Sequence, residues 1–374
     1  MNTTTNKTNS IKIAHIADCH LRQRQYGYPQ RGEDFLKGIL SAIKTAHENG
    51  ADLILVAGDM LDSTNPGAAV CIDQLDEIQS VLKELKFRMY ITSGNHDKTY
   101  PHWCSRFNKF FTEETGGMRV IDNEMITIKK DGIELSIYGL PFMSDNEFRD
   151  SIEELPSADI LVWHAAIKEF TGYPTDNAIS CAELDCGKWK LVAMGDQHIH
   201  KYLKEGNTTI AYPGSTELCS TSEDFEKQFL MYTWTDKDNF SIDSIPFVTR
   251  KKQQFIVKTE KELDKAIKEF DSSAILFIKY AKEIPNASFR INKALKSTNI
   301  ARLIPLTSTK KNGSDITVKE LRDPVSYLRD NINILVNDTD RAQRISSLCV
   351  SVLSQDIDYM KDIEQYCEAK LNGK

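Results

Sequence analysis

Five short apolar runs of this sequence share one feature: each is closely followed by a histidine, an aspartate or an asparagine. The runs and the polar residues behind them are 11–17 with Asp18 and His20, 53–57 with Asp59, 89–91 with Asn95 and His96, 160–163 with His164, and 191–194 with Asp196, His198 and His200. The run 53–57 has no polar alternation, which is typical of a strand covered on both faces. Open α/β sheets bind ligands at the carboxyl ends of such strands. We therefore predict that the five strand ends meet at one metal site.

The segments between these runs predict helices and further strands. Apolar residues at helical spacing mark two helices, one with Phe35, Leu36, Ile39, Leu40 and Ile43, the other with Cys71, Leu75, Ile78, Leu82 and Leu85. Residues 125–128 and 133–138 flank a turn and predict a hairpin. Residues 208–212 and 228–234 predict two more strands. The expected fold class is α/β (α+β), with two sheets packed face to face and helices outside.

The net charge and the cysteine pattern limit the class of protein to which this sequence can belong. The net charge of −7 argues against a surface coated with positive charge, although a local basic groove for nucleic acid remains compatible with it. None of the eight cysteines forms a C-x-x-C pair, and residues 1–10 are polar. We therefore expect reduced thiols, a cytoplasmic protein and no membrane segment.

A composition shift at 250–252 and a polar stretch at 307–314 suggest domain boundaries. We expect a disordered tail at 1–10 and a main α/β domain at 11–249. A small α+β module should cover 250–306 and a linker 307–338. The last segment, 339–374, has an amphipathic helical pattern.

The residue types at the strand ends fit a pair of metal ions. Two ions that activate water for phosphodiester hydrolysis take histidine nitrogens together with carboxylate and amide oxygens. Asp18 and His20 can reach one ion from a single strand end, and Asp59 can bridge two ions. Alone, an Asp-x-His pair is as readily a capped strand end, and His164 a core histidine. The ordered set of five such pieces is what indicates a metal site.

The motifs IADCHL (16–21), VAGDMLD (56–62), TSGNHD (92–97), VWHAA (162–166) and AMGDQHIH (193–200) resemble those of the calcineurin-like metallophosphoesterases. With the following YPGSTELCS (212–220), they look like the SbcD-type branch of DNA double-strand-break-repair nucleases. The resemblance implies a four-layer β-sandwich flanked by helices, a small capping domain at 250–306 and a C-terminal helix. The compact length is similar to that of phage-encoded members.

The resemblance also implies roles for single residues. Asp18, His20 and Asp59 would hold the first metal, with Asp59 shared, and Asn95 and His164 the second. His96 would protonate the leaving 3′ oxygen rather than bind metal. Asp62 would orient His96, and Asp97 would stabilise its own loop. The implied cofactors are two Mn²⁺, with Mg²⁺ possible.

The last motif departs from the family pattern, which is Gly-His-x-His. An ungapped match puts Asp196 and His198 in the ligand positions, and a carboxylate can replace an imidazole on a hard ion. A slipped loop would instead make His198 and His200 the pair. Both readings remain open at this point, and the ungapped one is favoured.

Basic and aromatic residues follow two of the strand ends. The expected DNA contacts are Arg22, Arg24, Arg31, Lys98 and Arg106, with Tyr26 and Tyr28 beside the first three. Ordinary solvated loops are the alternative. The resemblance implies a partner, an SbcC-type coiled-coil ATPase that binds residues 339–374, and a homodimer within a heterotetramer. Residues 71–85 are a candidate dimer face, although packing into the core explains them better.

These expectations combine into one functional prediction: a two-metal DNA nuclease, exonuclease or endonuclease, that serves repair or recombination with its ATPase. A metallophosphoesterase acting on nucleotides or phosphoproteins shares the motifs and is the first alternative. A catalytically silent scaffold of the repair complex is the second.

Overall fold

A computed structural model describes residues 9–67, 70–97, 103–171, 178–220, 223, 226–296 and 299–306. The chain divides into two compact units, Met1–Thr307 and Ser308–Lys374. The expected linker at 307–338 and helical segment at 339–374 lie outside the described residues, as does most of the expected tail.

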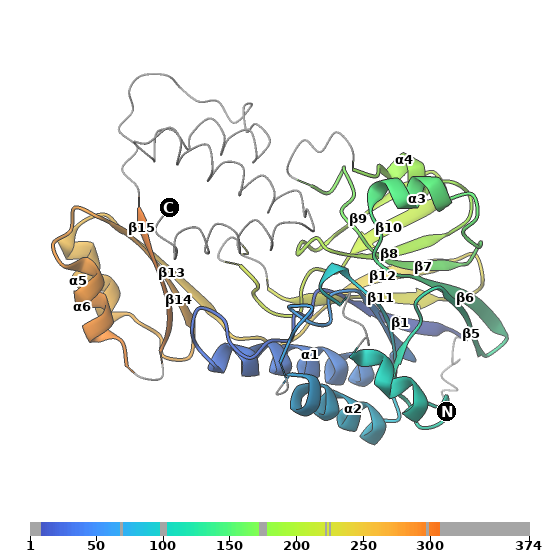
Figure 1. Cartoon of the computed structure of the whole chain (residues 1–374), viewed down its shortest axis with the longest axis horizontal. Helices are drawn as coiled ribbons and strands as arrows, with labels where there is room; N and C mark the ends of the chain where they lie inside the picture. The colour runs from blue at the N-terminus through green and yellow to red at the C-terminus, as the bar shows by residue number, and fades with distance from the viewer. Residues whose placement is uncertain are drawn as a thin grey trace, which may run out of the picture. The chain divides into compact units, whose positions relative to one another are not determined.

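The first sheet has six strands in the order β12-β11-β1-β2-β3-β4 (Figure 1). Its strands are β1 (Ile11–Ile16), β2 (Leu53–Ala57), β3 (Arg88–Thr92), β4 (Gly117–Val120), β11 (Gln228–Trp234) and β12 (Phe240–Pro246). Strands β1 to β4 are parallel, whereas β11 pairs antiparallel with β1 and β12. Every residue of β2 is buried, as its unbroken apolar sequence predicts.

The second sheet also has six strands, in the order β5-β6-β7-β8-β10-β9. They are β5 (Glu124–Lys130), β6 (Ile133–Leu140), β7 (Ile160–His164), β8 (Leu191–Gly195), β9 (Lys201–Glu205) and β10 (Thr208–Tyr212). Strands β6, β7, β8 and β10 are parallel. The antiparallel β5–β6 pair is the predicted hairpin.

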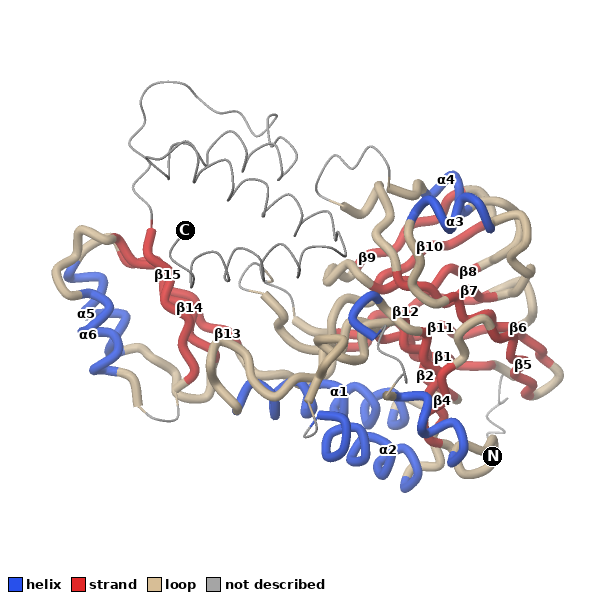
Figure 2. Tube along the Cα trace, in the orientation of Figure 1, coloured by secondary structure: helices blue, strands red, loops and turns tan. Residues whose placement is uncertain are grey.

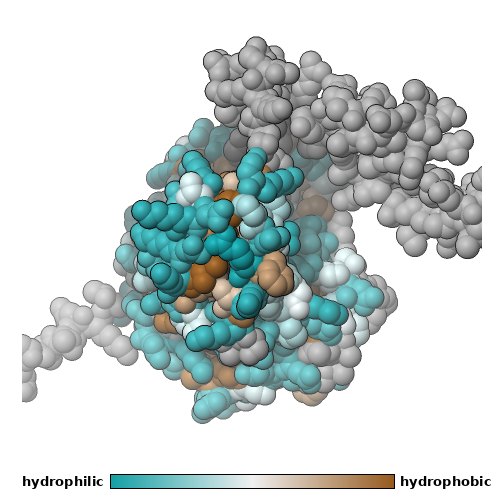
Figure 3. Space-filling model, turned by 90° about the vertical axis from the view of Figure 1, so that its left-hand side faces the viewer, coloured by the Kyte–Doolittle hydropathy of each residue, from teal (hydrophilic) through white to brown (hydrophobic). Residues whose placement is uncertain are grey.

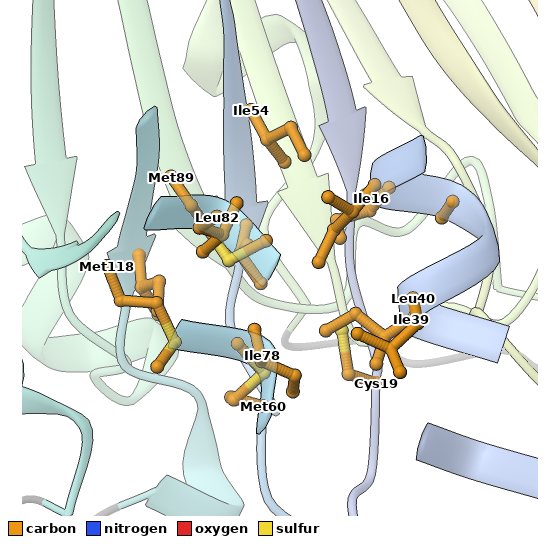
Figure 4. Close-up of a cluster of buried hydrophobic side chains, with 14 of the residues drawn as sticks. Ile16, Cys19, Ile39, Leu40, Ile54, Met60, Ile78, Leu82, Met89 and Met118 are labelled. Carbon is orange, nitrogen blue, oxygen red and sulfur yellow. The ribbon is translucent and has the colours of Figure 1, made fainter. Parts of the chain in front are cut away.

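The two sheets share one hydrophobic core, in which Leu55 and Tyr90 of the first sheet lie with Val162 and Ala193 of the second. Helices α1 (Gln30–Glu48) and α2 (Leu75–Glu84) cover the outer face of the first sheet. Figure 4 shows this outer core, with side chains of both helices gathered against Ile16 and Met89. Leu75, Ile78 and Leu82 are buried there, so core packing accounts for them and they offer no free dimer face.

The outer face of the second sheet is covered by α3 (Asp145–Ser151) and α4 (Cys181–Leu184). Phe148 of α3 stacks on Trp163 of β7 with ring centroids 4.2 Å apart. Both helices begin with a capping box, at Ser144 and Ser180. The order helix, sheet, sheet, helix is the predicted four-layer sandwich. Short helical turns η1 (Val70–Gln74), η2 (Asn95–Asp97) and η3 (Cys104–Phe110) complete the domain.

A small module follows, with three parallel strands in the order β13-β14-β15 (Figure 2). They are β13 (Lys252–Val257), β14 (Ile275–Ala281) and β15 (Ile300–Leu306), with α5 (Glu260–Lys268) and α6 (Ala287–Ala294) between them. The helices pack on one face of the sheet. On the other side, Phe277 lies with Tyr26, Tyr28 and Leu218 of the sandwich domain. The end of the molecule at this module is mostly hydrophilic, with scattered hydrophobic patches (Figure 3).

Candidate metal centre

The register of the parallel strands places the polar residues at one edge. Ile16 pairs with Val56, and Ala57 pairs with Thr92, so the segments that follow β1, β2 and β3 leave the sheet side by side. In the second sheet, His164 pairs with Gly195. The two edges are joined by a hydrogen bond of 2.8 Å between His164 Nδ1 and the carbonyl oxygen of Ala57. All five predicted strand ends therefore lie together, as expected from the sequence.

The backbone of these strand ends takes conformations that residues other than glycine rarely adopt. Asp18, His20 and Asp59 have φ of 52°, 47° and 50°, in the left-handed region. The strands hold them there, because His20 N donates to the carbonyl oxygen of Asp59 at 2.9 Å. Left-handed residues that the surrounding structure enforces cluster at functional sites.

The first donor cluster contains Asp18, His20 and Asp59, which each offer one ligand atom within 4.8 Å of the others. His198 joins it, because its Nε2 lies 3.1 Å from His20 Nε2 and 3.9 Å from Asp18 Oδ1. Two imidazole nitrogens that face each other at this distance repel unless a proton or a cation lies between them. The residues present thus fit a metal ion.

The second donor cluster is centred on His164 Nε2. This nitrogen lies 3.0 Å from Asn95 Oδ1, 3.4 Å from Asp59 Oδ1 and 3.9 Å from Asp196 Oδ1. The other oxygen of Asp59, Oδ2, lies 3.7 Å from His20 Nε2 in the first cluster. Asp59 therefore stands between the two clusters with one oxygen directed to each, which is the geometry of a bridging ligand.

The electrostatics of the site favour positive charge. Burial raises the pKa of Asp18 to about 6, although His164 and His198 oppose the rise. Burial also acts to raise the pKa of Asp59, but the hydrogen bond and charge of His164 bring it to about 2. Burial alone would lower the pKa of His164, yet Asp59 and Asp18 raise it to about 10. Buried carboxylates thus hold the His164 imidazole as a cation, whereas burial lowers the pKa of His20, and divalent ions would supply positive charge at the same place.

The orientation of His198 depends on Glu223, which the sequence did not reveal. The Nδ1 atom of His198 lies 3.1 Å from Glu223 Oε1, so the Nε2 atom of His198 faces the first cluster. Burial opposes a charged His198, but Cys219 and Glu223 raise its pKa to about 11. Glu223 itself is buried and pairs with the buried Lys227. A carboxylate behind a metal-binding histidine fixes its tautomer and ring orientation.

His96 is set apart from the two clusters. Its side chain is 39% exposed, and its Nε2 lies 3.9 Å from Asp59 Oδ2. Its Nδ1 lies 2.5 Å from the backbone carbonyl oxygen of Asp62, whereas the carboxylate of Asp62 pairs with Arg22 at 2.5 Å. Asp62 therefore contacts His96 through its backbone carbonyl oxygen, while its carboxylate faces Arg22.

Asp97 supports the loops around the site. Its two carboxylate oxygens accept hydrogen bonds from the backbone nitrogens of Met60, Leu61 and Gly94, at 3.2, 3.0 and 2.9 Å. The first two follow Asp59 in the chain and the third precedes Asn95. One buried carboxylate therefore ties together the loops that carry two donors.

The two readings of the last motif differ clearly in the structure. Asp196 lies beside His164, and His198 lies beside His20. Both ring nitrogens of His200 have other partners: Nδ1 lies 3.1 Å from the carbonyl oxygen of Pro213, and Nε2 lies 2.7 Å from Ser244 Oγ. The geometry supports the ungapped reading, with Asp196 and His198 as the pair.

The structure places the residues predicted to contact DNA in different environments. Arg31 is fully buried and pairs with Asp34 at 2.9 Å and Glu217 at 3.4 Å, so the prediction that it contacts DNA is wrong. Arg24 is exposed. Arg22 pairs with Asp62, and Arg106 pairs with Asp76 of α2 at 2.7 Å. Lys98 lies outside the described residues.

The predicted aromatic contacts also differ. The Tyr26 ring meets Phe277 of the small module edge-on, with centroids 6.1 Å apart, and Tyr28 belongs to the same cluster. These rings therefore join the module to the sandwich and are not free to stack on a base.

Among the described residues, no helix is long and apolar enough to cross a membrane.

Residues 11–200, slightly more than half of the chain, match the family model of the calcineurin-like phosphoesterases. The chain therefore belongs to the calcineurin-like phosphoesterase family, and the predicted resemblance is confirmed.

Its curated relatives include several proteins named DNA double-strand break repair protein Mre11. The one from Methanosarcina mazei is 26% identical over 347 residues, which are 89% of this chain and 53% of that protein. The one from Thermoplasma acidophilum is 24% identical over 375 residues, 94% of this chain and 96% of that protein. The chain spans about half the length of the relatives from Methanosarcina mazei and Archaeoglobus fulgidus.

Solved structures that align with the chain include a dimetal phosphatase from Danio rerio, with 8% identity over 64% of this chain and 98% of that chain and a TM-score of 0.43. Another is TT1561 of Thermus thermophilus, with 12% identity over 63% of this chain and 99% of that chain and a TM-score of 0.41.

Proposed function

We propose that the chain is a two-metal DNA nuclease that hydrolyses phosphodiester bonds in repair or recombination. The observation that carries this proposal is the position of Asp59, with one oxygen toward His20 and the other toward His164. A shared carboxylate between mixed nitrogen and oxygen donors is what two ions roughly 3.5–4 Å apart require. The first ion would be held by Asp18, His20, Asp59 and His198, and the second by Asp59, Asn95, His164 and Asp196.

The ions proposed are Mn²⁺, with Mg²⁺ as the alternative, because imidazole together with carboxylate and amide oxygens suits manganese. When bound, the pair of ions would lower the pKa of a water molecule and neutralise charge on the phosphate. The protein holds its ligands by neighbours outside the clusters: Ala57 fixes His164, and Glu223 fixes His198.

His96 is proposed as the general acid. The carbonyl oxygen of Asp62 accepts a hydrogen bond from His96 Nδ1–H and so fixes the ring. Nε2 then faces the edge of the site near Asp59. Partial exposure of the ring lets a leaving 3′ oxygen come within reach. A positioned acid of this kind contributes roughly 10²–10⁴-fold to the rate.

DNA is proposed as the substrate because relatives across 89% and 94% of the chain are named as DNA double-strand break repair proteins. Arg24, which is exposed beside the first strand end, is the proposed backbone contact. An SbcC-type ATPase bound at 339–374, a homodimer within a heterotetramer, and a cytoplasmic location (of the host, for a phage-encoded chain) are part of the same proposal. They rest on the motif resemblance and on the amphipathic pattern of that segment.

The test is a substrate panel with the full chain and Mn²⁺: linear duplex DNA, single-stranded DNA and a phosphomonoester. We expect cleavage of DNA, a loss of about 10²–10⁴-fold in His96→Asn, and unchanged metal content in that variant. His47→Asn is the matched control, because His47 is exposed on α1 and packs on Phe87.

Other outcomes point elsewhere. Hydrolysis of the phosphomonoester alone would identify a phosphoesterase for nucleotides or phosphoproteins. Metal and DNA binding without any hydrolysis would identify a scaffold.

A further inference from the structure

One thiol lies at the first donor cluster. Cys219, His20 and His198 each offer a ligand atom within 4.8 Å of the others. His20 and His198 also face each other directly, at 3.1 Å between their Nε2 atoms. Cys219 follows β10 in the segment that also carries Ser215 and Glu217. Cys219 lies within the YPGSTELCS motif, but neither the roles that the resemblance implies nor the proposed two-metal chemistry assigns it a function.

We propose that Cys219 is a ligand of the first metal ion, and that this ion is a thiolate-accepting divalent cation of the Zn²⁺ type. The inference rests on the proposed function only in placing an ion between His20 and His198. Zinc bonds are about 2.0 Å to nitrogen and 2.3 Å to sulfur, so donor atoms at tetrahedral angles stand about 3.3–3.7 Å apart, and zinc also accepts a fifth ligand. The distances in this cluster are within reach of that geometry by small side-chain rotations.

The backbone around Cys219 is fixed on both sides. Its own carbonyl oxygen accepts a hydrogen bond of 2.7 Å from Gln25 Nε2. The carbonyl oxygen of Leu218 accepts one of 2.8 Å from the buried Arg31. Cys219 Sγ donates a hydrogen bond of 3.4 Å to the carbonyl oxygen of Glu217, and a thiol is a weak donor. The side chain is therefore held near the cluster by strong backbone contacts, and little is lost when Sγ turns to an ion.

The other cysteine near the site does not compete for this role. Cys19 adjoins Asp18 but is fully buried in the outer core, among Ile39 and Leu40 (Figure 4). Cys219 is half-buried, so ions can reach it from solvent. Cys19 is buried because side chains alternate at the end of β1: those of Asp18 and His20 point to the metal site, and that of Cys19 points to the helices.

A sulfur ligand changes which ion is preferred. Divalent Mn²⁺ binds most weakly in the usual order of affinities, and a thiolate shifts the preference further toward Zn²⁺. On binding, the thiol releases its proton to solvent and Sγ donates an electron pair to the ion. The second cluster has oxygen donors and one imidazole, so it keeps its preference for Mn²⁺. The two positions would then hold different ions.

The test uses Co²⁺ as a spectroscopic substitute for Zn²⁺ in the metal-free full chain. A cobalt–thiolate bond gives an intense charge-transfer band in the near ultraviolet, which imidazole and carboxylate ligands do not give. We expect the band to grow with one equivalent of Co²⁺ per chain. Cys219→Ser should abolish it and weaken Zn²⁺ binding about tenfold or more. Cys186→Ser, at an exposed cysteine after α4, should leave it unchanged.

Cys219→His serves as the second variant, because it should keep the first ion without the thiolate band. Visible d–d absorption of bound Co²⁺ reports that each variant has folded. A wild-type chain that binds two Co²⁺ without a charge-transfer band would overturn the proposal, and so would a band that survives in Cys219→Ser. DNA cleavage is measured on the same samples. If the chain cleaves DNA but shows no charge-transfer band, only the proposed Cys219 ligand is contradicted. If it shows the band but does not cleave DNA, only the nuclease proposal is contradicted.

Discussion

Replacing Asp97 by asparagine should destabilise the sandwich domain and loosen the metal centre together. The carboxylate is 1% exposed and accepts three backbone hydrogen bonds, two at Oδ2 from Met60 and Gly94 and one at Oδ1 from Leu61. Asparagine has one oxygen, which can keep the two bonds at the Oδ2 position. Its NH₂ group then faces the N–H of Leu61, and two donors meet without an acceptor.

The magnitude follows from these contacts. A hydrogen bond to a charged group contributes about 1.5–3 kcal/mol, and a buried donor left without a partner costs a similar amount. We therefore expect the free energy of unfolding to fall by about 2–4 kcal/mol in Asp97→Asn. Because Asp59 and Asn95 lie on the tied loops, we also expect weaker metal binding at both clusters.

The assay is urea unfolding of the metal-free chain, followed by the fluorescence of the buried Trp163 and Trp234, with metal titration on the same preparation. Glu33→Gln is the matched control, because Glu33 is 65% exposed and pairs with Lys37 on the surface of α1. Such a pair contributes about 0–1 kcal/mol. If Asp97→Asn unfolds at the same urea concentration as Glu33→Gln, the tie between the two loops contributes nothing and the reasoning is wrong.

Three further predictions concern the site and its surroundings. Asp196→Asn should lose one of the two bound metal ions in a metal analysis, while His200→Ala keeps both, since His200 is bonded to Pro213 and Ser244; the reverse result would restore the slipped reading. Arg31→Met should lower the free energy of unfolding in urea by roughly 3–5 kcal/mol, because it leaves Asp34 and Glu217 buried near each other. Arg24→Ala should leave the free energy of unfolding unchanged and reduce the salt dependence of DNA binding. In the metal-free chain, the pKa of His164 is raised to about 10 from an ordinary 6.5, so its contribution to stability is fully present below pH 6.5 and is lost as the pH rises toward 10. The urea midpoint should therefore fall between pH 6.5 and 10. Excess Mn²⁺ should remove this fall, because Mn²⁺ binds the neutral imidazole.

The strand ends could be predicted from the sequence because they depend on local pattern. An apolar run followed by aspartate or histidine implies where the side chain will lie once the strand is placed in a parallel sheet. Helices α1 and α2 were predictable for the same reason, since they bury the residues at helical spacing, whereas the short helices α3 and α4 were not predicted. In the small module, β13 and β15 were missed. The polar residues Lys252, Gln253 and Gln254 and the proline at 305 hide the strand pattern.

Contacts between distant segments were not predictable in this way. Glu223 lies 25 residues from His198, and no local motif connects them. An arginine in a polar loop looks the same whether it meets DNA or, as Arg31 does, two buried carboxylates. The resemblance named Asp62 as the residue that orients His96 but could not say which of its atoms makes the contact, and in the structure that atom is the backbone carbonyl oxygen.

The hydrogen bond from His164 on β7 to Ala57 on β2 has a consequence for the timing of folding. The donors of each cluster come from both sheets, and their positions in the chain range from 18 to 198. Neither sheet alone carries a full set, so a half-made chain leaving the ribosome has no place for a pair of ions. We expect metal uptake to follow the docking of the two sheets, and the chain to acquire hydrolytic chemistry only as one of the last steps of its maturation.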